Sequence, residues 1–118
     1  MMKKLGIFFG LVMVIMVLSG SGSTMSAVEK AVFNVASYNL RQLNDGDTKA
    51  GNGWGRRCPV LGQLIRYHEF DIFGTQEGFK TQLDELKALL PGYDYIGAGR
   101  EDGRDAGEHS AIFYNTEK

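Results

Sequence analysis

The alternation of apolar and polar residues predicts a strand at the start of the chain's globular part. The segment AVFNVASYNLR, residues 31–41, is rich in β-branched and aromatic residues, which is typical of a strand. The polar end of this strand carries Asn39 and then Arg41. One face of the strand carries Phe33, Val35, Ser37 and Asn39.

Helical spacing replaces the alternation further along the chain. Apolar residues recur three and four positions apart behind Pro59, which suits the first turn of a helix. The predicted helix covers residues 60–69, and its apolar face carries Leu61, Leu64, Ile65 and His68. The other predicted elements are a strand over 71–76, a helix over 81–90 that Pro91 and Gly92 end, and strands over 93–97 and 111–114.

The stretch FDIFGTQEGF, residues 70–79, contains a strand that is apolar on both faces and leads directly into Glu77. Such strands are typical of parallel or mixed sheets that helices cover. The order strand, helix, strand, helix, strand, strand predicts an α/β fold with a mixed sheet. The first two strands are expected to be parallel, because a helix connects them.

A segment dense in Gly, Asn and Asp, residues 42–57, predicts a long loop between the first strand and the first helix. One interpretation is a solvated excursion. The other is a binding loop, because it leaves the end of a strand. Trp54 and Arg57 then line a pocket, although Trp54 equally suits a place over the core.

The first 27 residues have the order of a secretory signal peptide: Lys3 and Lys4, an apolar run, and then small residues up to Ala27. The alternative is an uncleaved membrane anchor. The apolar run is short for a membrane span, which favours cleavage. The predicted domains are therefore a signal peptide over 1–27 and one small domain over 28–118. We expect export to the periplasm, the cell surface or the medium, with a membrane involved only during export.

Charge and cysteine content narrow the function classes. Without Lys3 and Lys4 the formal net charge moves from −1 to −3, which argues weakly against a non-specific nucleic-acid surface. Cys58 is the only cysteine, so no intrachain disulfide stabilises the domain. No stable protein partner is implied.

Polar side chains end the first two predicted strands. Asn39 and Glu77 are expected to share one edge of the sheet, because strands joined by a helical crossover finish at the same edge. Amide and carboxylate oxygens suit Mg²⁺ or Ca²⁺ better than zinc. Each residue also has an ordinary explanation: Asn39 as a turn residue, and Glu77 as a solvated acid. Spacing alone does not decide between them.

Three stretches together resemble a known family. SYNLR (37–41), DIFGTQE (71–77) and GREDGRDAGEHSAIFY (99–114) are similar to the N-terminal half of proteins of the endonuclease/exonuclease/phosphatase superfamily. Deoxyribonuclease I, exonuclease III, inositol polyphosphate phosphatases and bacterial sphingomyelinases belong to it. The resemblance implies a deoxyribonuclease-I-like α+β four-layer sandwich, whose mixed sheet has helices on one face and which is incomplete in this chain.

The resemblance also implies roles for individual residues. Glu77 corresponds to the family's metal-binding glutamate, and Asn39 to an asparagine beside the metal and the phosphate. Glu108 corresponds to a carboxylate that orients a catalytic histidine, and Arg100 and Arg41 are expected to bind substrate phosphate. Glu108 equally suits a solvated loop acid, and Arg100 a surface arginine. His109 and His68 are expected to be ordinary, because the family's general base comes from much later in the chain.

The implied chemistry is in-line attack of water on a phosphoester with Mg²⁺, or with Mn²⁺ or Ca²⁺ in its place. The substrate classes that fit are nucleic acid, phosphoinositide, sphingolipid and sugar phosphate. The family's later motifs, an Asp-x-Asn pair and a terminal Ser-Asp-His, are absent from these 118 residues. Three interpretations therefore stay open: the front half of an exported phosphoesterase, a truncated inactive remnant, and a small exported α/β binding module.

Overall fold

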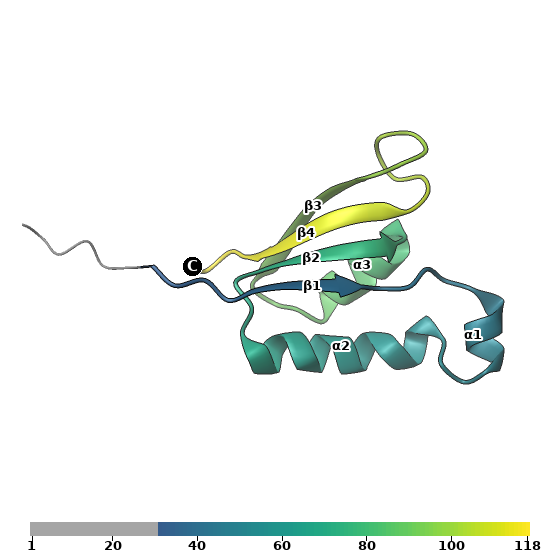
Figure 1. The fold of residues 1–118 in the computed structure, drawn as a ribbon, viewed down its shortest axis with the longest axis horizontal. Coiled ribbons are helices and arrows are strands. Elements are labelled where there is room, and N and C mark those ends of the chain that lie inside the picture. The colour runs from purple at the N-terminus through teal and green to yellow at the C-terminus, as the bar shows by residue number, and fades with distance from the viewer. Residues whose placement is uncertain (1–30) are drawn as a thin grey trace, which may run out of the picture. The chain divides into compact units, whose positions relative to one another are not determined.

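The computed structural model describes residues 31–118. The predicted signal peptide, residues 1–27, lies outside the described residues. The elements follow in the order β1 (Val35–Asn39), α1 (Asp45–Lys49), α2 (Trp54–His68), β2 (Ile72–Gly78), α3 (Lys80–Ala88), β3 (Tyr93–Gly99) and β4 (His109–Asn115) (Figure 1).

The four strands form one mixed sheet in the order β1-β2-β4-β3. β1 runs parallel to β2, and β4 is antiparallel to both β2 and β3. The predicted α/β fold class, the mixed sheet and the parallel first pair are therefore confirmed. Because β1 and β2 are parallel, their last residues lie at the same edge of the sheet, where the β3–β4 connection also lies (Figure 1).

Both long helices cover the same face of the sheet, as predicted (Figure 1). Phe73 and Phe113 stack at the centre of this face, with ring centroids 4.8 Å apart. The core that forms between helices and sheet consists of Leu40, Trp54, Cys58, Leu61, Ile65, Phe73, Leu83, Leu86, Leu90, Ala111 and Phe113. Burial raises the pKa of the Cys58 thiol to about 11, so this cysteine stays neutral and unreactive at ordinary pH.

The other face of the sheet is apolar but lies open in the described part of the chain. The exposed fractions of its side chains range from 37% to 67%, and these residues are Val35, Ile72, Ile96 and Ile112. Because β2 is apolar on both faces, the sequence predicts that other elements cover both faces of the sheet. Within residues 31–118 helices cover one face only. Among these residues no helix is both long and apolar enough to cross a bilayer.

The predicted loop 42–57 is wrong in part, because it contains α1 and the first turn of α2. The Asn44 side chain caps α1 by accepting the Asp47 N–H at 2.7 Å. α2 begins six residues earlier than predicted, at Trp54, whose ring is buried in the core. Pro59 therefore lies inside the helix and not in its first turn. The carbonyl that it leaves unbonded belongs to Gly55, which is exposed to water.

Smaller differences concern which residues the helices bury. Leu64 and His68, which the spacing placed on the apolar face, are exposed, whereas Leu61 and Ile65 are buried as expected. α3 ends at Ala88, two residues before the predicted end, yet Leu90 is still buried. β3 and β4 both extend further than predicted. The end of β3 and the start of β4 lie level with Gly78, the last residue of β2.

The contrast between the two faces of β4 is testable in the 118-residue chain. Phe113→Ala should lower the free energy of unfolding by about 3–5 kcal/mol, because it removes a fully buried ring from the core. Ile112→Ala, one residue away on the open face, should cost about 1 kcal/mol or less. Urea denaturation measures both values. Similar losses for the two variants would contradict the assignment of the faces.

Candidate functional site

The end of β2 contains a bulge that redirects Glu77. Thr75 pairs with Ala111 and Gly78 with His109, so two residues of β2 stand opposite one residue of β4. Within the bulge Glu77 adopts a φ of 59°, in the left-handed region that side chains rarely occupy. Bulges commonly re-aim a side chain next to a site, and strained residues persist where the surroundings fix them.

Gly78 allows the chain to leave the bulge against the core. A Cβ at this position would lie 2.9 Å from Leu40 Cδ1 and 3.2 Å from Leu83 Cδ2. A side chain at residue 78 would therefore push aside the ends of the Leu40 and Leu83 side chains. The absence of a side chain at residue 78 lets these two leucines pack against the end of β2.

Asn39 and Glu77 meet at this edge. Asn39 Nδ2 donates a hydrogen bond of 2.8 Å to Glu77 Oε1. The Asn39 Oδ1 atom accepts the Arg41 N–H at 2.7 Å, which fixes the amide on its other side. The structure thus brings together the two side chains that the sequence placed at one edge. Their roles as metal ligands stay predictions.

Arg41 points along the same edge but is paired with a carboxylate. It donates to both oxygens of Asp47, at 2.5 Å from Nε to Oδ2 and 2.9 Å from Nη2 to Oδ1. The Arg41 hydrogen bond, with a second one from Asn44, lowers the pKa of Asp47 to about 2, and the pair raises the pKa of Arg41. A phosphate that binds Arg41 would have to share it with Asp47.

Arg100 and Glu108 form a second pair, in the β3–β4 connection. Arg100 Nη1 lies 2.9 Å from Glu108 Oε2, and Arg100 N–H donates to the Glu108 carbonyl at 3.0 Å. Within residues 31–118 no hydrogen bond joins this pair to Asn39 or Glu77. The structure therefore brings Arg100 and Glu108 to each other, at the same end of the sheet.

In residues 31–118 neither histidine is hydrogen-bonded to Asn39 or Glu77, and their ordinary role stays a prediction. His109 is buried, and its ring nitrogens lie 3.0 Å and 3.1 Å from the carbonyl oxygens of Gly107 and Arg104, so it braces the β3–β4 connection. His68 is exposed at the end of α2, where its ring stacks on Phe70.

The donors at the edge fit one hard cation in part. In the described residues no cluster of three or more His, Cys, Asp or Glu side chains has the arrangement of a metal site. Mg²⁺, however, often takes only one or two carboxylates and fills its other positions with water and substrate phosphate. Glu77 provides one carboxylate, whose Oε1 alone is engaged by Asn39. The residues present therefore suit one side of such a site.

Sequence reasoning missed the residues whose hydrogen bonds support the ends of β1 and β2. Asp47 is one, because the helix α1 that carries it was predicted as loop. Gln82 is another: its side chain is fully buried and bonds to both strand ends. Arg57 lines a pocket with Tyr38, as the sequence suggests, but the hydrogen bonds of its guanidinium to backbone carbonyls were not foreseen. Asn44 three residues before Asp47 was a capping signal that could have indicated α1.

Similar proteins were found among solved structures. The chain matches no protein-family model and no curated protein sequence. Among solved structures it is similar to a mannosyl-6-phosphatase of Bacteroides thetaiotaomicron, with 62% identity and a TM-score of 0.72 over 74% of this chain and 33% of that one. An endonuclease/exonuclease/phosphatase family protein from the same organism gives 63% identity and 0.72 over 73% and 30%.

A third structure extends the similarity to another species. An endonuclease/exonuclease/phosphatase protein from Bacteroides vulgatus is 40% identical, with a TM-score of 0.71 over 75% of this chain and 33% of that one. The chain thus spans about a third of the length of the solved structures that it matches.

The strain at Glu77 is testable by two substitutions. Glu77→Gly and Glu77→Ala both remove the carboxylate, but only glycine accepts the positive φ freely. The left-handed region costs other residues about 1–2 kcal/mol, and glycine loses about 0.5–1 kcal/mol of chain entropy. The glycine variant should therefore be more stable by roughly 0.5–1 kcal/mol in urea denaturation. At Thr81, in the first turn of α3, the order should reverse. If the glycine variant were the more stable one at both positions, or the alanine variant at both, the strain at Glu77 would be contradicted.

The Arg41–Asp47 pair makes a prediction about acid stability. The pKa of Asp47 is about 2 in the folded chain and near 3.9 in an unfolded one. The pair therefore contributes fully above the unfolded value and is lost as the pH falls through about 2. Asp47→Asn should flatten the loss of stability between about pH 4 and pH 2, measured by urea denaturation across that range. The exposed Asp105→Asn is the control, and an unchanged slope in Asp47→Asn would refute the assignment.

Proposed function

We propose that this chain, which belongs to the endonuclease/exonuclease/phosphatase family, supplies one edge of the active site of an exported, divalent-metal-dependent phosphoesterase. The observation that carries the proposal is the Asn39–Glu77 hydrogen bond at the ends of two parallel strands, where a bulge redirects Glu77. Strong sequence identity to a mannosyl-6-phosphatase supports phosphoester hydrolysis.

A sugar phosphate is the substrate class that we favour. The 62% identity to a protein named mannosyl-6-phosphatase supports a phosphate monoester on a sugar over nucleic acid, phosphoinositide or sphingolipid. The mildly acidic composition is consistent with a small substrate, since it offers no broad basic surface for a polyanion.

In this proposal the free carboxylate oxygen of Glu77 holds Mg²⁺, or Mn²⁺ or Ca²⁺, at the edge of the sheet, and Asn39 lies beside the metal with its Oδ1 on the Arg41 N–H. When bound, the cation neutralises charge on the phosphate oxygens. Asn39 keeps the Glu77 carboxylate in one orientation through its Nδ2 donor. Arg41 and Arg100 bind the substrate phosphate, because a guanidinium group can donate to two phosphate oxygens at once. Each guanidinium is positioned by a carboxylate, Asp47 for Arg41 and Glu108 for Arg100.

Glu108 has a different part in the proposal. Its half-buried carboxylate already accepts a hydrogen bond from Arg100 and leaves one oxygen for a further donor. We infer that this oxygen orients the general-base histidine that the family carries in its later part. Such a histidine takes a proton from the attacking water.

The open face of the sheet is relevant to the competing interpretations. Val35, Ile72, Ile96 and Ile112 would be covered by the second sheet that the family resemblance implies. A complete phosphoesterase therefore needs sequence beyond the third of the fold matched here. If the reading frame at the source locus does not continue, a truncated remnant or a binding module becomes the better interpretation.

Metal-dependent hydrolysis by the protein made from its complete reading frame tests the proposal. Mannose 6-phosphate should be hydrolysed with Mg²⁺ or Mn²⁺ and not after removal of metal by EDTA. Glu77→Gln should lower kcat/KM by at least about 100-fold, because a metal at the phosphate supplies several kcal/mol and each 1.36 kcal/mol is tenfold in rate.

Glu117→Gln is the matched control, since Glu117 is exposed at the opposite end of the sheet. Its activity should equal that of the unmodified protein. Hydrolysis that survives EDTA, or equal activities of the Glu77→Gln and Glu117→Gln variants, would refute the metal role of Glu77. Secretion of the protein into the periplasm or medium, measured by cell fractionation, tests the proposed export.

A further inference from the structure

One buried side chain connects both strand ends of the site. Gln82, in the first turn of α3, is fully buried. Its Oε1 accepts the Phe79 N–H at 3.1 Å, and its Nε2 donates to the Arg41 carbonyl at 3.1 Å. The orientation of the amide is fixed by its partners, because the first offers only a donor and the second only an acceptor.

The two backbone groups that Gln82 joins flank the candidate ligands. Phe79 lies two residues after Glu77, and Arg41 lies two residues after Asn39. Arg41 and Glu77 both adopt positive φ values, 54° and 59°, although neither is glycine. Such backbone persists only where surrounding contacts over-determine it. Gln82 provides a contact of this kind to each segment.

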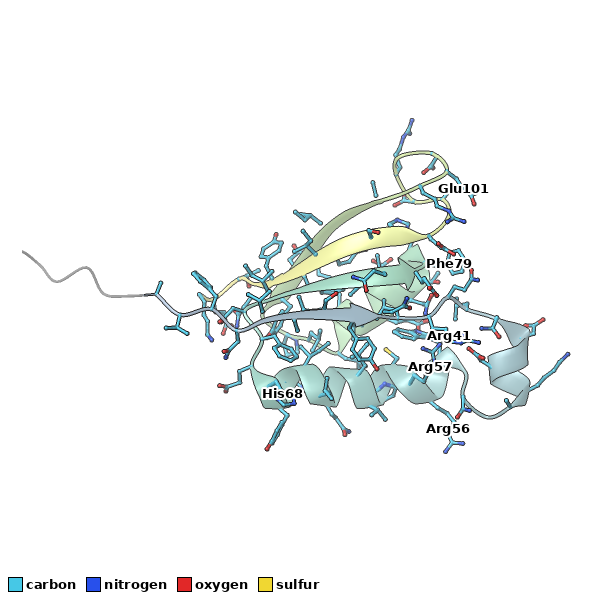
Figure 2. The ribbon with its side chains drawn as sticks, viewed as in Figure 1. Arg41, Arg56, Arg57, His68, Phe79 and Glu101 are labelled. Carbon is cyan, nitrogen blue, oxygen red and sulfur yellow. The ribbon has the colours of Figure 1, made fainter. Side chains whose placement is uncertain are left out.

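Arg57 holds the same segment from the side of α2. Its guanidinium donates to the carbonyl oxygens of Leu40 and Arg41, the latter at 3.3 Å, and to that of Asn52 at 2.9 Å. The guanidinium also lies 5.6 Å from the centre of the Trp54 ring. Figure 2 shows Arg41, Arg57 and Phe79 at the same end of the structure. The carbonyl of Arg41 thus accepts from two helices at once.

We propose that Gln82 is a positioning residue for the Asn39–Glu77 pair, with Arg57 as the second residue that holds the end of β1; the inference rests on the proposed function. Gln82 fixes how far the segment after Glu77 lies from the segment after Asn39. It touches neither substrate nor metal. Its effect on hydrolysis comes through the geometry of the pair, for which a shift of about 1 Å is costly.

Gln82→Glu is the sharpest variant. The glutamate has the same shape and still accepts the Phe79 N–H, but it replaces the donor to the Arg41 carbonyl with a second acceptor. Two oxygens then face each other at the position where the bond was. The glutamate keeps the volume of the side chain, but its ionised form also buries a charge without a partner, so the variant lowers stability as well as removing the donor to Arg41.

The first readout is the motion of the Asn39 side-chain amide, measured by ¹⁵N relaxation in the full chain without metal or substrate. In the unmodified protein this NH₂ group donates to Glu77 and should be ordered. In Gln82→Glu we expect its order parameter to fall below about 0.6, the range of flexible groups. Arg57→Lys, which keeps the charge but loses the planar fork, should give a fall in the same direction.

The second readout is the division of the effect between kcat and KM in the protein made from the complete reading frame. Gln82→Glu should lower kcat about 10- to 100-fold, the usual effect of losing a residue that orients a ligand. The KM should change little, because Gln82 does not contact the substrate. A residue that only stabilises the fold would leave both constants of the folded protein unchanged.

Two controls separate positioning from general stability. Gln63→Glu makes the same chemical change on the exposed side of α2 and should alter nothing. Leu90→Ala removes a buried side chain near the far end of α3, away from both strand ends, and should destabilise the chain without loosening Asn39. If Gln82→Glu fails to fold, Gln82→Met, which keeps the size of the side chain and removes both of its hydrogen bonds, takes its place.

The outcomes are distinguishable. Asn39 motion that is unchanged in Gln82→Glu, or raised equally in Leu90→Ala, would overturn the inference. The relaxation measurement needs no metal and no hydrolysis. An inactive unmodified protein would therefore refute the proposed function, while the motion of Asn39 still decides whether Gln82 positions the pair.

Discussion

The hydrogen bond between Asn39 and Glu77 depends on the parallel pairing of β1 with β2, and most features of the candidate site follow from that pairing. Parallel strands bring their last residues to one edge, and the register sets Asn39 opposite Gln76. Without a bulge, the following Glu77 would continue the alternation of β2. The bulge against β4 instead turns it in the left-handed region, within 2.8 Å of the Asn39 amide.

The backbone at the end of the two strands is strained, and buried contacts from the helices hold it in this conformation. Glu77 and Arg41 are both held at positive φ. Gly78 leaves room for the close approach of Leu40, and the buried Gln82 amide bonds to both segments. The residues that face the solvent at this edge are thus supported by residues of α2 and α3, which hydrogen-bond to the backbone of the same segments.

The fold and the pairing of Asn39 with Glu77 could be predicted from the sequence because they rest on periodicity. Alternation defined β1, and a helical crossover required β2 to be parallel to it. The supporting residues could not be predicted in the same way. The role of Gln82 depends on a backbone carbonyl 41 residues earlier in the chain, and its own neighbourhood indicates only an ordinary helix start. The early start of α2 is not predicted because Pro59 is typical of a first turn, whereas the helix begins five residues before it, at the buried Trp54.

The most direct test of the Asn39–Glu77 edge as a metal site is the localisation of Mn²⁺ in the full chain by paramagnetic broadening of NMR signals. If the edge binds the cation, the signals of Asn39 and Glu77 should broaden first as Mn²⁺ is added, and an excess of Mg²⁺ should reverse the effect. The same titration of Glu77→Gln should show no such focus. Broadening that is spread evenly over the acidic surface, or that is centred elsewhere, would contradict the assignment of this edge as the metal site.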